Sequence, residues 1–202
     1  MTVTRLVAVL VVILAAAGVY FLMLRQAPDS VPDASVESSA FTVGDPEFVL
    51  VMVLDGGEVR INLRPDLAPK HVERLKVLTR QGFYDGIVFH RVIDGFMAQT
   101  GDPTGTGSGG SDLPDLAAEF SEAAFKRGVL GMARTADPNS ANSQFFITYA
   151  DASHLNGQYT VFGEVAEGMD LVDKIKKGSP AQNGLVADPD KIIRMRVAAD
   201  NQ

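Results

Sequence analysis

The chain has 202 residues, no cysteine, and 25 acidic against 18 basic residues, for a formal net charge of −7. Nucleic acid is therefore not the expected partner, because phosphate backbones are bound by basic surfaces. The fold depends on no disulfide, which is compatible with an exported protein but does not require export.

The first 24 residues are predicted to be a membrane anchor or a signal segment. Residues 6–24 are a run of 19 residues without a charge. As a helix this run would span about 28 Å, close to the roughly 30 Å of a bilayer core. A cleaved signal peptide is the alternative, since residues 15–18 (AAAG) are small enough for cleavage. The apolar run continues beyond that site, further than a cleavable segment normally does, so we favour an uncleaved anchor.

A change of composition separates this segment from the body. Residues 25–46 are rich in Pro, Ser, Asp and Ala and poor in bulky apolar residues, as a flexible linker is. Residues 47–202 are long enough for one domain with its own core. Arg5 and Arg25 flank the anchor, so basic residues specify its orientation only weakly. We expect the domain to lie outside the cytoplasm.

Short strands dominate the predicted domain. They cover residues 48–54, 58–63, 88–93, 96–100, 128–133, 144–149, 159–165 and 191–197. Two helices are predicted, one from Pro69 to just before Gly82 and one over 168–177. Eight strands with only two helices indicate a mainly β fold, a closed eight-stranded antiparallel β-barrel with the helices at its ends.

Two polar residues, Arg91 and Gln99, interrupt apolar strand-like runs. The Asp94-Gly95 pair between the runs is a tight-turn signal, so the runs are predicted to form a hairpin in which Arg91 and Gln99 come close. An exposed strand face is the simpler interpretation of a lone arginine. A cation beside an amide and apolar neighbours is, however, also what a shallow binding pocket contains.

Three familiar motifs are incomplete. Residues 105–110 match G-x-G-x-x-G, but no βαβ unit surrounds them, which favours a glycine-rich surface loop over a dinucleotide site. The only histidines, His71, His90 and His154, lack metal-ligand spacing, so no metal site is expected. No serine lies in G-x-S-x-G, although catalytic triads are recognised by geometry rather than by sequence.

The aromatic pair Phe145-Phe146 adds a second sign of a pocket. Neighbouring residues of a strand face opposite ways, so one ring is expected in the core and the other elsewhere. Together with Phe96, Met97 and Leu155, the second ring could line an apolar cleft beside the arginine.

Three blocks of the sequence resemble the signatures of the cyclophilin-type peptidyl-prolyl isomerases. They are FHRVIDGFMAQTGDPTGTGSGG (89–110), GVLGMARTADPNSANSQFFI (128–147) and HLNGQYTVFGEV (154–165). The resemblance covers about residues 47–197, and its first two blocks are highly specific. The family's eight-stranded antiparallel barrel, closed by two helices, agrees with the predicted elements. The resemblance implies an enzyme that accelerates the rotation of X-Pro bonds without a cofactor or a metal.

The resemblance also implies roles for individual residues. The family's catalytic arginine falls on Arg91, and the glutamine that steadies it falls on Gln99. The substrate-binding positions fall on Phe96, Met97, Phe146 and Leu155 in the proline pocket, on Ala133, Arg134 and Gln144 in the neighbouring peptide groove, and on His154 and Tyr159.

At His154 and Tyr159 the chain departs from the common pattern, because many members carry tryptophan and histidine there. We expect both changes to alter ligand preference more than activity. An imidazole covers less apolar surface than an indole, so weak cyclosporin binding is expected. Arg134 stands where eukaryotic members often have asparagine, at a position where the family contacts the peptide largely through backbone.

A proline-peptide-binding chaperone or scaffold module without significant catalysis is the alternative function. Retention of both Arg91 and Gln99 favours the enzyme, and a purely structural barrel leaves both residues unexplained. The expected clients are exported, proline-containing polypeptides. We expect a monomer in a bacterial inner membrane, single-pass, with the catalytic domain facing the periplasm. The alternative location is secreted or periplasmic, after signal cleavage.

Overall fold

The computed structural model describes residues 42–201, so the predicted anchor and most of the predicted linker lie outside the described part of the chain. Within residues 42–201 no helix is both long and apolar enough to cross a membrane. The anchor therefore stays a prediction from the sequence.

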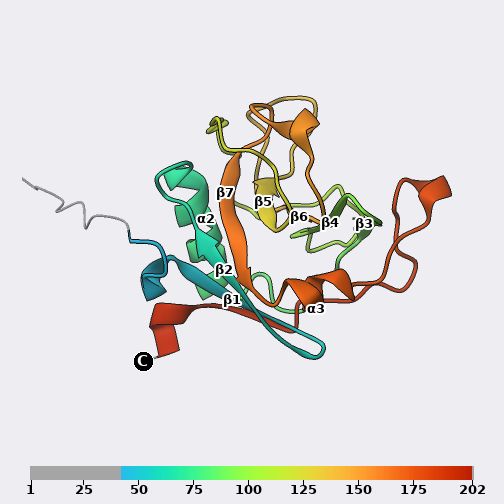
Figure 1. Cartoon of the computed structure of the whole chain (residues 1–202), viewed down its shortest axis with the longest axis horizontal. Coiled ribbons are helices and arrows are strands. Elements are labelled where there is room, and N and C mark those ends of the chain that lie inside the picture. The colour runs from blue at the N-terminus through green and yellow to red at the C-terminus, as the bar shows by residue number, and fades with distance from the viewer. Residues whose placement is uncertain (1–41, 202) are drawn as a thin grey trace, which may run out of the picture. The chain divides into compact units, whose positions relative to one another are not determined.

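Eight antiparallel strands form one sheet, which curves into a half-barrel (Figure 1). The strands are β1 (Val49–Leu54), β2 (Gly57–Leu63), β3 (Arg91–Ile93), β4 (Met97–Thr100), β5 (Val129–Met132), β6 (Phe145–Thr148), β7 (Val161–Glu167) and β8 (Arg194–Val197). Their order in the sheet is β3-β4-β6-β5-β7-β2-β1-β8. The mainly β, eight-stranded antiparallel fold predicted from the sequence is thus confirmed.

The prediction of a closed barrel is wrong, because the edge strands β3 and β8 do not pair with each other. Instead, the irregular chain 184–192 bonds to residues 86–92. The Phe89 amide donates to Asp190 O at 2.8 Å, and the Ile192 amide donates to Ile87 O at 2.9 Å. Pro189 lies within this segment. Proline has no amide hydrogen to donate to a ladder, which is one reason why the segment forms no regular strand.

Helix α2 (Pro69–Arg80) has the predicted extent and buries the predicted apolar face of Val72, Leu75 and Leu78. Helix α3 (Met169–Asp173) is shorter than the predicted 168–177. After α3 the Lys176 amide donates to the Asp190 carboxylate at 2.8 Å, and the Gly178 amide donates to Val92 O at 2.9 Å. These tertiary bonds replace the helical ones, so the chain turns towards β3 instead of continuing the helix.

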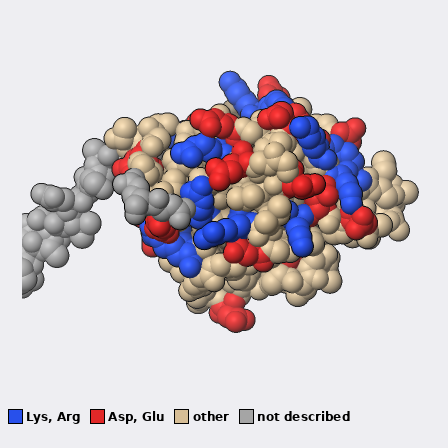
Figure 2. All heavy atoms as spheres, turned by 90° about the horizontal axis from the view of Figure 1, so that it is seen from below, with Lys and Arg blue, Asp and Glu red and all other residues tan. Residues whose placement is uncertain are grey.

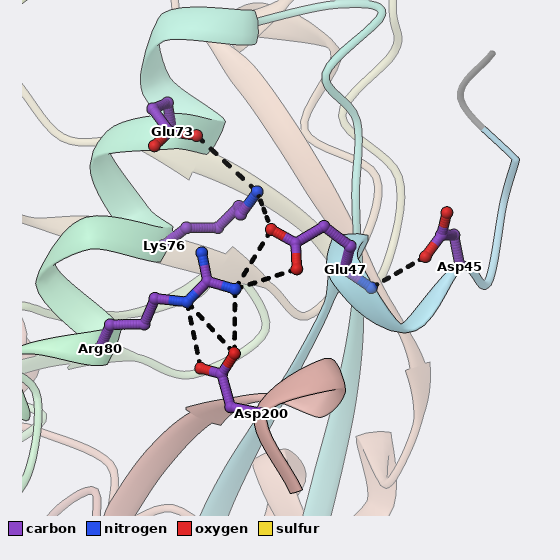
Figure 3. A network of polar contacts seen from close by, with 6 residues as sticks. All are labelled: Asp45, Glu47, Glu73, Lys76, Arg80 and Asp200. Atoms are coloured by element: carbon purple, nitrogen blue, oxygen red, sulfur yellow. Dashed lines mark hydrogen bonds and ion pairs between the residues drawn. The ribbon is translucent and has the colours of Figure 1, made fainter. Parts of the chain in front are cut away.

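Both ends of the described chain are joined to α2 by ion pairs (Figure 3). The short 3-10 helices η1 (Pro46–Phe48) and η4 (Ala198–Asn201) bring Glu47 and Asp200 to this helix. The Arg80 Nη2 atom lies 2.9 Å from a carboxylate oxygen of each of these two residues. Glu47 also pairs with Lys76. We call Glu47, Lys76, Arg80 and Asp200 the terminal clamp.

The buried apolar residues form two clusters. The larger lies between the sheet and the helices and includes Phe145 and Phe162. The smaller contains Met97, Phe125 and Phe146 and lies beneath the candidate site described below. On the face shown in Figure 2, lysines and arginines lie among acidic residues rather than in one extended basic patch.

Candidate active site

The hairpin of β3 and β4 brings Arg91 and Gln99 together, as the sequence predicted. The two residues are directly opposite each other in the antiparallel register. Gly95, in the turn, has a φ of +69°, which glycine adopts without strain. The Arg91 Nη1 atom donates to Gln99 Oε1 at 3.1 Å.

A second residue, Asn183, holds the other side of the guanidinium. The Arg91 Nε atom donates to Asn183 O at 3.0 Å, and Nη2 donates to Asn183 Oδ1 at 3.1 Å. Asn183 follows the 3-10 helix η3 (Pro180–Gln182) and lies outside the three blocks that carry the family resemblance. Sequence analysis missed it, and only the Asn-Gly pair at 183–184 marks a turn there.

The hydrogen bonds continue from Gln99 into the glycine-rich loop. The Gln99 Nε2 atom donates to Gln144 Oε1 at 2.9 Å. The Gln144 Nε2 atom in turn donates to Gly107 O at 3.0 Å and to Gly109 O at 2.8 Å. One chain of bonds therefore runs from the loop at 183 through the arginine to the loop at 107–109.

The charge of Arg91 has no ionic partner within residues 42–201, because no carboxylate there lies within salt-bridge distance of it. All three of its hydrogen-bond partners are neutral oxygens. Burial lowers the pKa of Arg91, and Tyr159 offsets part of this effect. The guanidinium still carries its full charge at neutral pH, since an arginine pKa starts far above that range. This positive charge is available to a ligand.

A cavity of about 300 Å³ opens beside this guanidinium. Its lining contains every site residue predicted from the sequence except one: Arg91, Phe96, Met97, Gln99, Ala133, Arg134, Phe146, His154, Leu155 and Tyr159. The exception, Gln144, lines an adjoining groove of about 480 Å³, which shares Gln99, Ala133 and Arg134 with the cavity. The structure thus brings the predicted residues together, while their roles remain predictions.

The aromatic wall of the cavity depends on a glycine. Phe145 is fully buried in the larger cluster, whereas Phe146 faces the cavity, as the strand period requires. Gly131 is opposite Phe146 in the sheet, and a Cβ atom there would lie 2.5 Å from Phe146 Cζ. Phe125 stacks on Phe146 with the ring centroids 5.6 Å apart. Sequence analysis missed Gly131 and Phe125, because they act through packing against Phe146 from other segments of the chain.

Comparison with known proteins identifies the family. The model of the family described as cyclophilin type peptidyl-prolyl cis-trans isomerase/CLD matches residues 48–197. The chain belongs to this family. A protein of Brucella suis named as a probable peptidyl-prolyl cis-trans isomerase is 55% identical over 172 residues, covering 80% of this chain and 88% of the relative. A peptidyl-prolyl cis-trans isomerase-like 3 of Homo sapiens is 43% identical over 127 residues, covering 61% of this chain and 78% of its own length.

Solved structures of cyclophilins have the same fold as this chain. A cyclophilin from Hirschia baltica superposes with a TM-score of 0.70 at 26% identity, over 80% of this chain and 77% of its own. A cyclophilin-type isomerase of Cryptosporidium parvum, crystallised in the presence of the dipeptide Ala-Pro, gives a TM-score of 0.67 at 30% identity, over 74% of this chain and 98% of its own.

The rim of this cyclophilin's cavity contains the two departures from the common pattern. The exposed His154 ring lies 5.3 Å from Phe96. The Tyr159 ring packs edge-on against Phe146 at 5.7 Å and lies 4.5 Å below the guanidinium of Arg134. His154 and Tyr159 thus add two further rings to the lining of the cavity, beside Phe96 and Phe146.

The carboxylate of Asp102 accepts hydrogen bonds from the glycine-rich loop of the cyclophilin. The Gly107 amide donates to Asp102 Oδ2 at 2.6 Å, and the amide and hydroxyl of Thr104 donate to Oδ1 at 2.7 and 2.8 Å. Burial raises the pKa of Asp102, but the hydrogen bonds outweigh it and bring the pKa to about 2.

No helix follows the loop within residues 101–125, as expected for a surface loop. Within residues 42–201 no three His, Asp or Glu side chains gather as a metal site would need.

Proposed function

We propose that this protein accelerates cis–trans rotation of X-Pro bonds in polypeptides, with Arg91 as the catalytic residue. The observation that carries the proposal is a positive charge whose hydrogen-bond partners within residues 42–201 are all neutral oxygens, beside a cavity with an apolar part. A proline ring would occupy the apolar part of that cavity, against Phe96, Met97, Phe146 and Leu155.

The chemistry of the reaction explains why this equipment is sufficient. Rotation about an X-Pro bond crosses a barrier of about 18–20 kcal/mol because it breaks amide resonance. In the twisted state the lone pair returns to the prolyl nitrogen and can accept a hydrogen bond. A donor that bonds more strongly to the twisted state than to the planar states lowers the barrier. No nucleophile, metal or cofactor takes part.

The adjoining groove supports a polypeptide substrate rather than free proline. Gln144, Ala133 and Arg134 line this groove next to the cavity. We assign it to the residues that precede the proline. The relative from Cryptosporidium parvum was crystallised in the presence of Ala-Pro, which is a substrate fragment of this kind.

The test is a protease-coupled proline-peptide assay on the full chain in detergent. Acceleration of the slow isomerisation phase is expected, and it should disappear when Arg91 is replaced by alanine. A wild-type protein that bound proline peptides without accelerating this phase would instead be the chaperone or scaffold module.

We propose further that residues 6–24 anchor a monomer in a bacterial inner membrane with the domain facing the periplasm, where its clients are exported proteins. The support is the length of the uncharged run, which is enough to span a bilayer. The full chain should then resist extraction from membranes by alkaline carbonate. Protease added to spheroplasts should digest the domain. A soluble product beginning near residue 18 would show signal cleavage, and protection from the protease would reverse the topology.

Weak cyclosporin binding is proposed from His154, which has less apolar area than the tryptophan of many cyclophilins. His154 is exposed, and its ring lies 5.3 Å from the ring of Phe96, which lines the cavity. His154→Trp should tighten cyclosporin by about 1–2 kcal/mol, through added apolar contact and a hydrogen bond. Titration of both proteins with the drug checks this. Tight inhibition of the wild type would contradict the proposal that His154 weakens cyclosporin binding.

A further inference from the structure

Among residues 42–201, Asn183 makes the most hydrogen bonds to Arg91, yet it belongs to none of the sequence blocks. It offers two acceptors, its backbone oxygen to Nε and its side-chain oxygen to Nη2. Gln99 offers one, to Nη1. A guanidinium has five N–H donors. Residues 42–201 therefore engage three of them and leave one N–H on each terminal nitrogen for the substrate.

The backbone at this position is unusual. Asn183 is the sole non-glycine residue within 42–201 with a positive φ, at +53°. Asparagine tolerates this left-handed conformation better than most residues do. It also carries an oxygen that can accept from a guanidinium, a combination that glycine lacks.

The loop that carries Asn183 is pressed against β3. The Gly184 amide donates to Ser179 O at 2.8 Å, which closes the loop, and the Val92 amide donates to Gly184 O at 2.8 Å. A Cβ atom at Gly184 would lie 2.5 Å from Ile93 Cγ1. The contact is therefore close enough to fix where Asn183 stands relative to Arg91.

We propose that Asn183 is a positioning residue, which together with Gln99 fixes the plane of the Arg91 guanidinium so that its two remaining N–H groups face the cavity. The proposal rests on the proposed function, because a fixed donor direction matters for a twisted X-Pro bond. A hydrogen-bond donor stabilises a transition state most when it is already oriented.

The first test is kinetic and uses the full chain in detergent. Asn183→Gly keeps the backbone acceptor, adopts the positive φ without strain and removes the side chain together with its Oδ1 acceptor. We expect kcat to fall about tenfold, the scale of one hydrogen bond to a charged group, with the Kd for a proline peptide changed less than about twofold. Gln182→Ala is the matched control, because Gln182 is exposed, adjoins Asn183 and makes no side-chain hydrogen bond in the described part of the chain. A fall of less than about twofold in Asn183→Gly, or an equal fall in the control, would overturn the proposal.

The second test does not depend on activity. Nuclear magnetic resonance of the Arg91 side chain measures the rate of rotation about its Nε–Cζ bond. The rotation should be slow in the wild type, faster in Asn183→Gly and slow again in Asn183→Asp, which restores the acceptor. Equal rates in the wild type and Asn183→Gly would refute the positioning role. If the wild type lacked isomerase activity, the proposed function would fail while this measurement still decided the role of Asn183.

Discussion

Arg80 and Arg91 are held in opposite ways. In the terminal clamp, Arg80 binds the carboxylates of Asp200 and Glu47, whose hydrogen bonds raise its pKa. In the candidate active site, Arg91 binds carbonyl and amide oxygens and no carboxylate of residues 42–201, and burial lowers its pKa. Both guanidiniums are held by hydrogen bonds, but among the described residues only that of Arg80 has carboxylate partners.

The difference separates a structural arginine from a functional one. The carboxylates of Glu47 and Asp200 neutralise the charge of Arg80 and join η1, η4 and α2. The terminal clamp therefore stabilises the folded state. Neutral oxygens orient Arg91 without cancelling its charge, which stays available to a substrate. A carboxylate beside Arg91 would compete with that substrate for the same donors.

The largest expected effect comes from removing each arginine in turn. Arg91→Ala should lower kcat/KM by about 2–4 kcal/mol of transition-state stabilisation, the scale of losing one oriented donor. Its Tm should hardly change. Arg80→Ala should do the reverse, with unfolding easier by about 1 kcal/mol and normal activity per folded molecule. Peptide isomerisation and thermal unfolding, followed for both variants, check the pair. Normal turnover in Arg91→Ala would refute the assigned mechanism.

A smaller effect is expected from giving Arg91 a carboxylate partner like those of Arg80 in the terminal clamp. Gln99→Glu would place a carboxylate opposite Arg91 at nearly unchanged volume. Because the charge would then be neutralised, kcat/KM should fall by about 1–2 kcal/mol. The stability should change little, since the new ion pair with Arg91 offsets the lost hydrogen bond from Gln99 Nε2 to Gln144 Oε1. Isomerase assays and denaturant unfolding measure the two effects. Unchanged activity would show that catalysis does not require an unpaired charge on Arg91.

The converse change in the clamp should affect stability alone. Glu47→Gln leaves Lys76 and Arg80 without one carboxylate and should lower the free energy of unfolding by about 1 kcal/mol. Activity per folded molecule should not change, since Glu47 does not line the cavity. Urea unfolding of the variant beside the wild type provides the measurement. A loss of activity without a loss of stability would show that the two regions are coupled.

The smallest effect is expected from mild acid. Burial raises the pKa of Glu47, but the hydrogen bonds from Lys76 and Arg80 outweigh it, so the folded pKa lies below its ordinary value of 4.5. A lowered folded pKa means that this stabilisation is complete above pH 4.5 and is lost as the pH falls through the folded value. The Tm should therefore drop below pH 4.5, and by less in Glu47→Gln. The activity per folded molecule should stay level there, because neither Arg91 nor Gln99 titrates in that range. Identical acid profiles for the two proteins would contradict this.

Much of the site was predictable because it is local in the chain. The pairing of Arg91 with Gln99 follows from the two-residue strand period and a glycine turn, which together set the register of a short hairpin. The same period places Phe145 in the core and Phe146 at the cavity. These features depend on residues within ten positions of one another, where backbone geometry alone places the side chains.

The extent of α3 and the closure of the barrel were mispredicted for a different reason. The apolar spacing and lysines of 168–177 are typical of a helix, but Asp190 and Val92, distant in sequence, take over its last hydrogen bonds. Eight strands suggested a closed ladder, whereas an irregular segment containing Pro189 bonds along residues 86–92 instead.

By itself the sequence determined the strands and the main helix, because periodicity and turn residues encode them locally, and its resemblance to the cyclophilin signatures indicated which residues surround the cavity. Only the tertiary structure decided that Asn183 holds Arg91, that Gly131 makes room for Phe146, and that no carboxylate within residues 42–201 neutralises the arginine. These facts join segments that are far apart in the chain. They depend on how the loop after α3 packs on β3 and how β5 lies beside β6, and no local pattern specifies such packing.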